Sequence, residues 1–108
     1  MKLQIKTTNI ELTEAIRSYI EEKILLLKKF LVHFEKNQEV FVQIEVGKTT
    51  NHHKKGEVFR AEANLDLIPN TVLRAESVSD DLYFAINDVR NKLEKQIEVY
   101  KAKLEARI

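Results

Sequence analysis

Three consecutive stretches of this chain alternate apolar and polar side chains, which is the spacing of strands that bury one face. They cover residues 40–46, 58–67 and 72–77, with polar turn segments between them. Residues 2–6 alternate in the same way. Because three strands in succession favour an antiparallel meander, we expect a four-stranded sheet in which most neighbours are antiparallel.

Two longer segments repeat apolar residues every three or four positions, as amphipathic helices do. The first begins after Thr13, whose hydroxyl can cap a helix, and we expect it to end near Asn37. The second begins within 79–81, where Ser and Asp side chains can also cap, and its apolar seam ends at Leu104. The predicted fold is therefore α+β with the order β-α-β-β-β-α, and both helices pack on one face of the sheet.

A chain of 108 residues allows a single domain, residues 1–108, whose core needs neither a metal nor a disulfide. We expect the apolar stripes of the strands and helices to meet in that core. Its predicted members are Ile16, Ile20, Leu27, Val42, Ile44, Ala61, Ala63, Leu73, Ile86, Val89 and Leu93.

The sequence also limits where the protein works. Its longest apolar run, Ile24–Leu27, is far shorter than the roughly twenty residues of a membrane span, and the N-terminus has no apolar signal core. The absence of Cys fits a reducing compartment. We therefore expect a soluble, cytoplasmic protein with no membrane partner.

No residue pattern predicts catalysis. Gly47 and Gly56, the two glycines, are too far apart for the glycine-rich loops that hold phosphates. The histidines, His33, His52 and His53, have no carboxylate or Cys at close ligand spacing. We therefore expect no enzymatic activity, no catalytic residue, no metal, no cofactor and no small-molecule substrate.

The arrangement of charge carries more information than the net charge, which is only +1. In the second helix, Lys92, Lys95 and Lys103 lie on one flank of the seam, and we expect Lys92 and Lys95 to be available to phosphates. The charge pattern alone still favours an ordinary solvated helix face. A polyanion would also meet the lysines of the first helix and of the 47–56 loop, which we interpret as a mobile hairpin tip: Lys23, Lys28, Lys29, Lys54 and Lys55.

The helical segments contain two long blocks, ELTEAIRSYIEEKILLLKKF at Glu11–Phe30 and DDLYFAINDVRNKLEKQ at Asp80–Gln96. Together they resemble the hibernation-promoting factor and ribosome-associated inhibitor family, whose members are also called ribosomal subunit interface proteins and sigma-54 modulation proteins. The likeness covers essentially the whole chain and the same order of elements. It implies a fold similar to double-stranded-RNA-binding domains.

The resemblance implies a non-enzymatic bacterial factor that binds rRNA of the small ribosomal subunit in the channel used by mRNA and tRNA, and so blocks translation under stress. The D-x-Y element at Asp81 and Tyr83 would start and pack the second helix, and Gln96 completes a KLxKQ element. The expected rRNA-binding residues, which combine the family positions with the charge pattern, are Arg17, Lys23, Lys28, Lys29, Lys54, Lys55, Arg90, Lys92, Lys95, Gln96, Lys101 and Lys103.

The last turns of the second helix depart from the family pattern at Glu98, Val99 and Glu105. The chain ends at Ile108, as in the short form of the family, although a truncated long form would have the same sequence. Whether it promotes or opposes ribosome pairing stays open. Two other functions also stay open: a protein-interaction module, such as a weak homodimer formed through Leu25 and Leu26, and a general RNA-binding domain.

Overall fold

The structure of the chain is a computed structural model that describes residues 1–36, 38–49, 56–67 and 71–106. Its elements, in chain order, are β1 (Lys2–Thr8), α1 (Glu14–Leu25), the 3₁₀ helix η1 (Lys28–Phe30), α2 (Val32–Glu35), β2 (Phe41–Lys48), β3 (Phe59–Leu67), β4 (Thr71–Ser79) and α3 (Leu82–Glu105).

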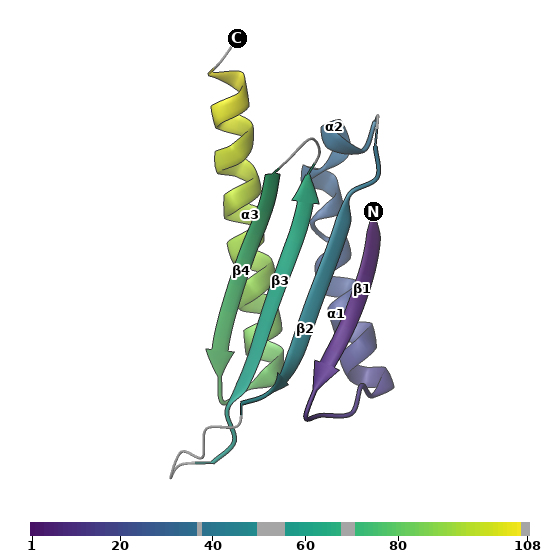
Figure 1. Cartoon of the computed structure of the whole chain (residues 1–108), viewed down its shortest axis with the longest axis vertical. Coiled ribbons are helices and arrows are strands. Elements are labelled where there is room, and N and C mark those ends of the chain that lie inside the picture. The colour runs from purple at the N-terminus through teal and green to yellow at the C-terminus, as the bar shows by residue number, and fades with distance from the viewer. Residues whose placement is uncertain (37, 50–55, 68–70, 107–108) are drawn as a thin grey trace.

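The four strands form one sheet in the order β1-β2-β3-β4. β1 is parallel to β2, whereas β2–β3 and β3–β4 are antiparallel. The helices cover one face of the sheet and leave the other open (Figure 1). The predicted α+β fold with a mostly antiparallel sheet is therefore confirmed. No helix in the described part of the chain is long and apolar enough to cross a membrane.

The end predicted for the first helix, near Asn37, is wrong. α1 ends at Leu25, and the chain then continues through η1 and α2, while Asn37 lies outside the described residues. Backbone bonds from Leu27 to Ile24 and from Phe30 to Leu27 each span three residues, as in a 3₁₀ helix. Apolar periodicity could not reveal this change, because both kinds of helix return a side chain to the same face after three or four residues.

Both predicted helix starts are confirmed. The Thr13 hydroxyl accepts a hydrogen bond from the Ile16 amide at 3.2 Å. At α3 the cap is Asp81, whose carboxylate accepts from the amides of Tyr83 and Phe84 at 3.0 and 3.3 Å. These bonds satisfy backbone donors that a helix leaves unpaired at its first turn, so they fix where each helix begins.

Gly47 lies inside β2 rather than at its end, because the strand continues to Lys48. It faces Thr8 across the parallel pair. A Cβ atom at Gly47 would lie 2.3 Å from the Thr8 carbonyl oxygen. Glycine is therefore required here by the close approach of β1 and not by a turn.

Most of the predicted core is confirmed, but Ile16 and Leu73 are only half-buried. Ile16 is in the first turn of α1, and Leu73 is on the edge strand β4, so each has neighbours on fewer sides. The seam of α3 is buried only as far as Ile97, and Leu104 is exposed. Figure 1 gives the reason: the last turns of α3 project beyond the ends of the strands.

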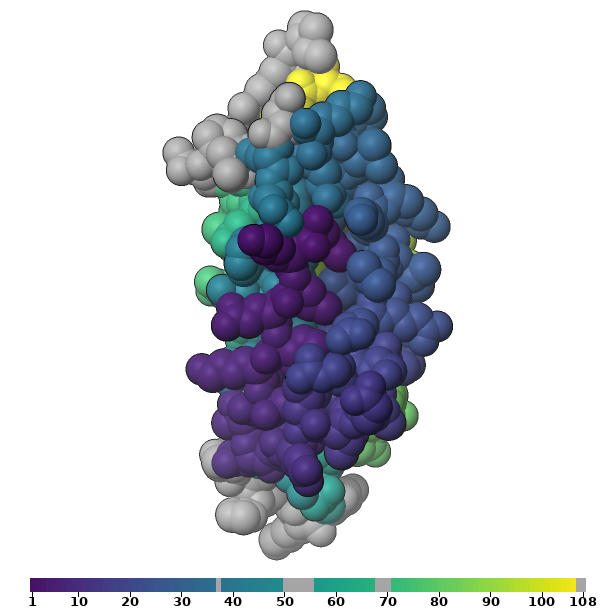
Figure 2. Space-filling model, turned by 90° about the vertical axis from the view of Figure 1, so that its right-hand side faces the viewer, coloured from purple at the N-terminus to yellow at the C-terminus, as the bar shows by residue number. Residues whose placement is uncertain are grey.

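The two long helices also contact each other. The Tyr19 ring of α1 meets the Tyr83 ring of α3 edge-on, with centroids 4.8 Å apart. Figure 2 shows the side of the molecule where β1 and α1 lie next to each other, with the end of α3 emerging near α2. The helical layer is therefore continuous from α1 to α3.

We predict that Leu93→Ala lowers the free energy of unfolding by about 2 to 5 kcal/mol, because Leu93 is fully buried and the smaller side chain leaves a cavity. Urea denaturation followed by circular dichroism measures the change. The matched control is Val99→Ala on the exposed side of α3, which should cost roughly 0.5 kcal/mol or less. Equal, small effects of the two changes would contradict the packing described for α3.

Candidate nucleic-acid interface

The C-terminal ends of the helical segments lie together at one end of the molecule. α1 and α3 run in the same direction, away from the end of the sheet where β1 stops (Figure 1). Helix C-termini favour positive charge because their carbonyl dipoles point outward. Four predicted lysines of α1, η1 and the end of α3 are called the helix-side lysines below: Lys23, Lys28, Lys29 and Lys101.

Aromatic rings position three of these lysines. The Nζ atoms of Lys29 and Lys101 lie 5.1 and 5.9 Å from the centroid of the same Phe30 ring. Lys23 stands over the Tyr19 ring at 5.3 Å. An ammonium group over a ring face is attracted by roughly 0.5 to 1 kcal/mol at an exposed site. Phe30 therefore contacts two positive charges that come from distant parts of the chain.

The helix-side lysines make no ion pair with any described residue, and neither do Lys95 and Lys103. Two other predicted contacts are paired within their own helices. Arg17 lies 3.9 Å from Glu21, and Arg90 lies 3.3 Å from Glu94. Of the predicted set, the helix-side lysines, Lys95 and Lys103 are thus the described cations of the helical layer that have no ion-pair partner.

The remaining predicted residues of α3 lie on its other flank, beside β4, and are called the β4-flank residues: Lys92, Lys95, Gln96 and Lys103. The Lys92 ammonium lies 3.2 Å from an Asp88 oxygen and donates to the Glu76 carbonyl at 2.8 Å. Gln96 donates to the Arg74 carbonyl at 2.6 Å. Lys92 therefore has partners within the chain, and its binding to phosphates stays a prediction.

These two contacts cover the outer edge of β4. An edge strand presents unpaired backbone groups to which another chain can add, and proteins commonly block such edges with charged side chains.

Hydrogen bonding from buried Ser77, together with Lys92, lowers the pKa of Asp88. The contacts of ionised Asp88 therefore stabilise the folded state at pH values above the ordinary pKa of Asp. This stabilisation is lost as the pH falls through the lowered pKa.

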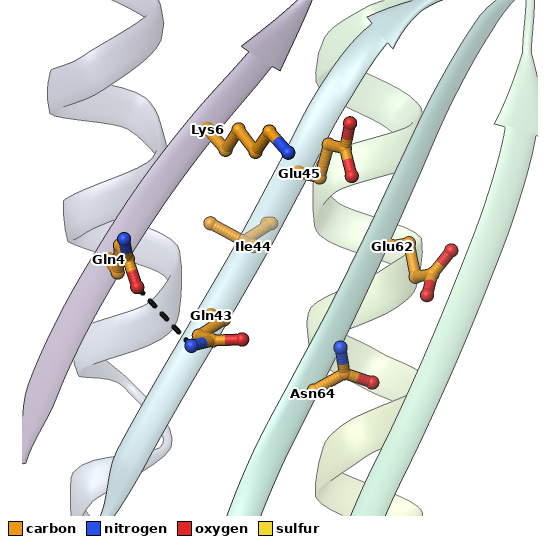
Figure 3. Close-up of a pocket in the computed structure, with 7 residues that line it drawn as sticks. All are labelled: Gln4, Lys6, Gln43, Ile44, Glu45, Glu62 and Asn64. Carbon is orange, nitrogen blue, oxygen red and sulfur yellow. Dashed lines mark hydrogen bonds between the residues drawn. The ribbon is translucent and has the colours of Figure 1, made fainter.

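The open face of the sheet is a second candidate for a functional site. A shallow polar hollow lies there between β1, β2 and β3, where Gln43 donates to Gln4 at 3.2 Å (Figure 3). Next to it, Glu45, Glu62 and Glu76 face one another across neighbouring strands. No group of described residues could hold a metal ion. The hollow offers neither a nucleophile with a base nor a cation site.

Arg60 neutralises this row of carboxylates. It pairs with Glu76 at 3.0 Å and also with Glu62. Hydrogen bonding from Arg60 lowers the pKa of Glu76, and the same contact raises the pKa of Arg60. Like charges facing each other across strands are destabilising, so Arg60 is needed to balance the row.

Two expected rRNA contacts, Lys54 and Lys55, lie outside the described residues, as do His52 and His53.

The sequence did not identify Phe30 as the residue that organises the helix-side lysines. The adjacent Lys29 was a partial signal, but Lys101 reaches the ring only in the folded chain.

Comparison with known proteins adds an independent line of evidence. The sequence profile of the family described as "Sigma 54 modulation protein / S30EA ribosomal protein" matches residues 3–105. The ribosome hibernation promotion factor of Lactococcus lactis is 36% identical over 104 residues, which cover 96% of this chain and 51% of that protein. The protein of the same name from Staphylococcus aureus is 36% identical over 106 residues, which cover 96% and 50%. The chain spans about half the length of these curated relatives.

Two solved structures are similar as well. The crystal structure of the Thermus thermophilus Protein Y N-terminal domain aligns with a TM-score of 0.74 and 29% identity, over 93% of this chain and 99% of that one. A ribosomal subunit interface protein from Coxiella burnetii has a TM-score of 0.72 at 24% identity, over 94% and 99%. The second likeness supports the fold alone.

We predict that Lys92→Ala and Lys95→Ala differ in their effect on stability. Loss of the Lys92 contacts should lower the free energy of unfolding by about 0.5 to 1 kcal/mol, since a charged hydrogen bond to the backbone and an exposed ion pair disappear. Lys95→Ala should lower the free energy of unfolding by about 0.5 kcal/mol or less. Urea denaturation of both variants decides this, and equal midpoints would show that Lys92 does not hold the β4 edge.

Proposed function

The chain belongs to the Sigma 54 modulation protein / S30EA ribosomal protein family, and we propose that it is a ribosome hibernation factor that binds the small ribosomal subunit. It occupies the channel through which mRNA and tRNA pass, and translation stops because the channel is blocked. This mechanism requires occupancy and no chemical step, so the protein acts without being an enzyme.

The observation that carries the proposal is the group of helix-side lysines. They come from α1, η1 and α3, lie on one continuous helical layer, and have no ion-pair partner among the described residues. A lysine without a carboxylate partner can neutralise a phosphate and release the counterion bound there. Two relatives are named ribosome hibernation promotion factor, which favours rRNA as the source of those phosphates.

The arrangement suits folded RNA recognised through its backbone. Paired RNA exposes phosphates and 2′-hydroxyls across a wide minor groove, and its base edges are largely out of reach of side chains in the narrow major groove. Phe30 contacts both Lys29 and Lys101, whose charges can act on phosphates of the same RNA. We therefore expect binding that follows the shape of the rRNA and not its sequence.

Exposed leucines favour a second function, a homodimeric interaction module. Leu25 and Leu26 at the end of α1 are 54% and 43% exposed. A contact between such side chains would be apolar and would hardly respond to salt, whereas phosphate binding weakens steeply as salt rises. The response to salt therefore separates the two functions: ribosome binding through phosphates weakens steeply, whereas self-association through the leucines hardly changes.

We predict a steep loss of small-subunit binding with salt. If four phosphates are neutralised, the log-log slope should be roughly −3, so that raising monovalent salt from about 50 to 200 mM weakens binding by nearly two decades. Co-sedimentation with purified small subunits at several salt concentrations measures the slope. An affinity that is flat over this range would remove the electrostatic mechanism, and failure to inhibit a cell-free translation extract would remove the hibernation role.

We predict that the double change Lys29→Ala/Lys101→Ala reduces the magnitude of the salt slope by about 1.5, because two phosphate contacts are lost. The matched control is Lys2→Ala/Lys6→Ala, which removes the same charge from exposed residues of β1 on the open face. The control should keep the parental melting temperature, whereas Lys29→Ala/Lys101→Ala should lower it by several degrees because two contacts with the Phe30 ring are lost. If the two double variants bind equally well, the helix-side lysines are not the rRNA contact.

A further inference from the structure

The protection of the β4 edge is incomplete. In an antiparallel ladder, alternate residues of an edge strand direct their backbone N–H and C=O groups away from the sheet. On β4 these include Val72, Arg74 and Glu76, which alternate with the residues that face the helices. α3 covers the carbonyls of Arg74 and Glu76. No side chain of the described residues bonds the backbone of Val72, so the edge is open there.

This open part of the edge borders an apolar cleft between β4 and the C-terminal half of α3. The cleft has a volume of about 410 Å³, and the side chains of Leu73, Val99 and Tyr100 form its walls. Val99 is 55% exposed. An exposed apolar wall next to free backbone groups is the combination that extended peptides use.

The charges around the cleft are all positive. Lys95 and Lys103 stand at its rim, and no carboxylate lines it. Arg74 lies on the same edge strand, but its side chain is on the open face of the sheet, where it donates to the Asn64 side chain at 2.7 Å. None of these three cations makes an ion pair with a described residue. A partner that complements this cleft therefore carries apolar side chains together with carboxylates.

We propose that the cleft binds a short, extended, acidic segment of a partner protein, which adds to the β4 edge at Val72. Its apolar side chains enter the cleft, and its carboxylates pair with Lys95 and Lys103. The cleft is less suited to an RNA base. The Tyr100 ring already stacks on Phe34 with centroids 5.8 Å apart, and its hydroxyl bonds Thr71 at 3.3 Å. The helix-side lysines are not involved, so this inference stands apart from ribosome binding.

The test uses the whole chain without ribosomes. The probe is a fluorescent hexapeptide that alternates valine and glutamate and is blocked at both ends. Fluorescence polarisation should show saturable binding, and replacement of the glutamates by glutamine should weaken it roughly tenfold. In ¹⁵N-correlated NMR spectra, the amide signals of Val72 and Leu73 should shift on titration.

A matched pair of variants locates the site. Val99→Glu places a negative charge on the wall of the cleft and should weaken peptide binding by roughly tenfold or more. Val78→Glu adds the same charge at the far end of β4, at a residue that is 53% exposed, and should leave binding unchanged. Lys103→Glu provides an independent second variant at the rim if Val99→Glu lowers the melting temperature.

Three results would overturn the proposal. The first is an absence of saturable binding up to about 1 mM peptide. The second is equal weakening by Val99→Glu and Val78→Glu, because the charge would then act non-specifically. The third is an oligouridylate that shifts the Val72 and Leu73 amides and is itself blocked by Val99→Glu, because the cleft would then be an RNA site.

Discussion

The apolar seam of α3 on the sheet is the contact on which the rest of the structure depends. Its buried residues, from Leu82 to Ile97, cover β3 and β4, while α1 covers the remaining part of the same face. Both helices bury their stripes on this one face, and each follows a strand, β1 or β4, that ends at the same end of the sheet, so they lie side by side and run in the same direction. The C-terminal ends of their dipoles therefore point toward the same end of the molecule, where Lys29 and Lys101 contact Phe30.

The fold could be predicted from sequence because each element carries a local signal. Alternation identified the strands, and caps at Thr13 and Asp81 marked the helix starts. The break after Leu25 escaped prediction, since 3₁₀ and α turns share nearly the same apolar spacing. The need for Gly47 inside β2 also escaped prediction, because it depends on Thr8, a residue distant in sequence.

The candidate site could be predicted only as a set of residue types. Helical spacing placed Lys92 and Lys95 on one flank, but it could not show that Lys92 reaches the Glu76 carbonyl of a neighbouring strand. It also could not show that Phe30 joins Lys29 to Lys101. Both facts depend on tertiary contacts. Lysines with the same sequence pattern therefore divide into those that hold the fold together and those that are open to a partner.

The open face of the sheet carries many charges, yet it is poorly suited to a polyanion. Arg60 is committed to Glu62 and Glu76, and Lys6 lies opposite Glu45 in the strand register. A phosphate approaching this face would meet the row of carboxylates and would have to displace an existing pair, at the cost of leaving a carboxylate without its partner. The helix-side lysines impose no such cost. The two faces therefore differ in the carboxylates that lie beside their cations and not in the number of charges, and under the proposed function the helical layer faces the RNA.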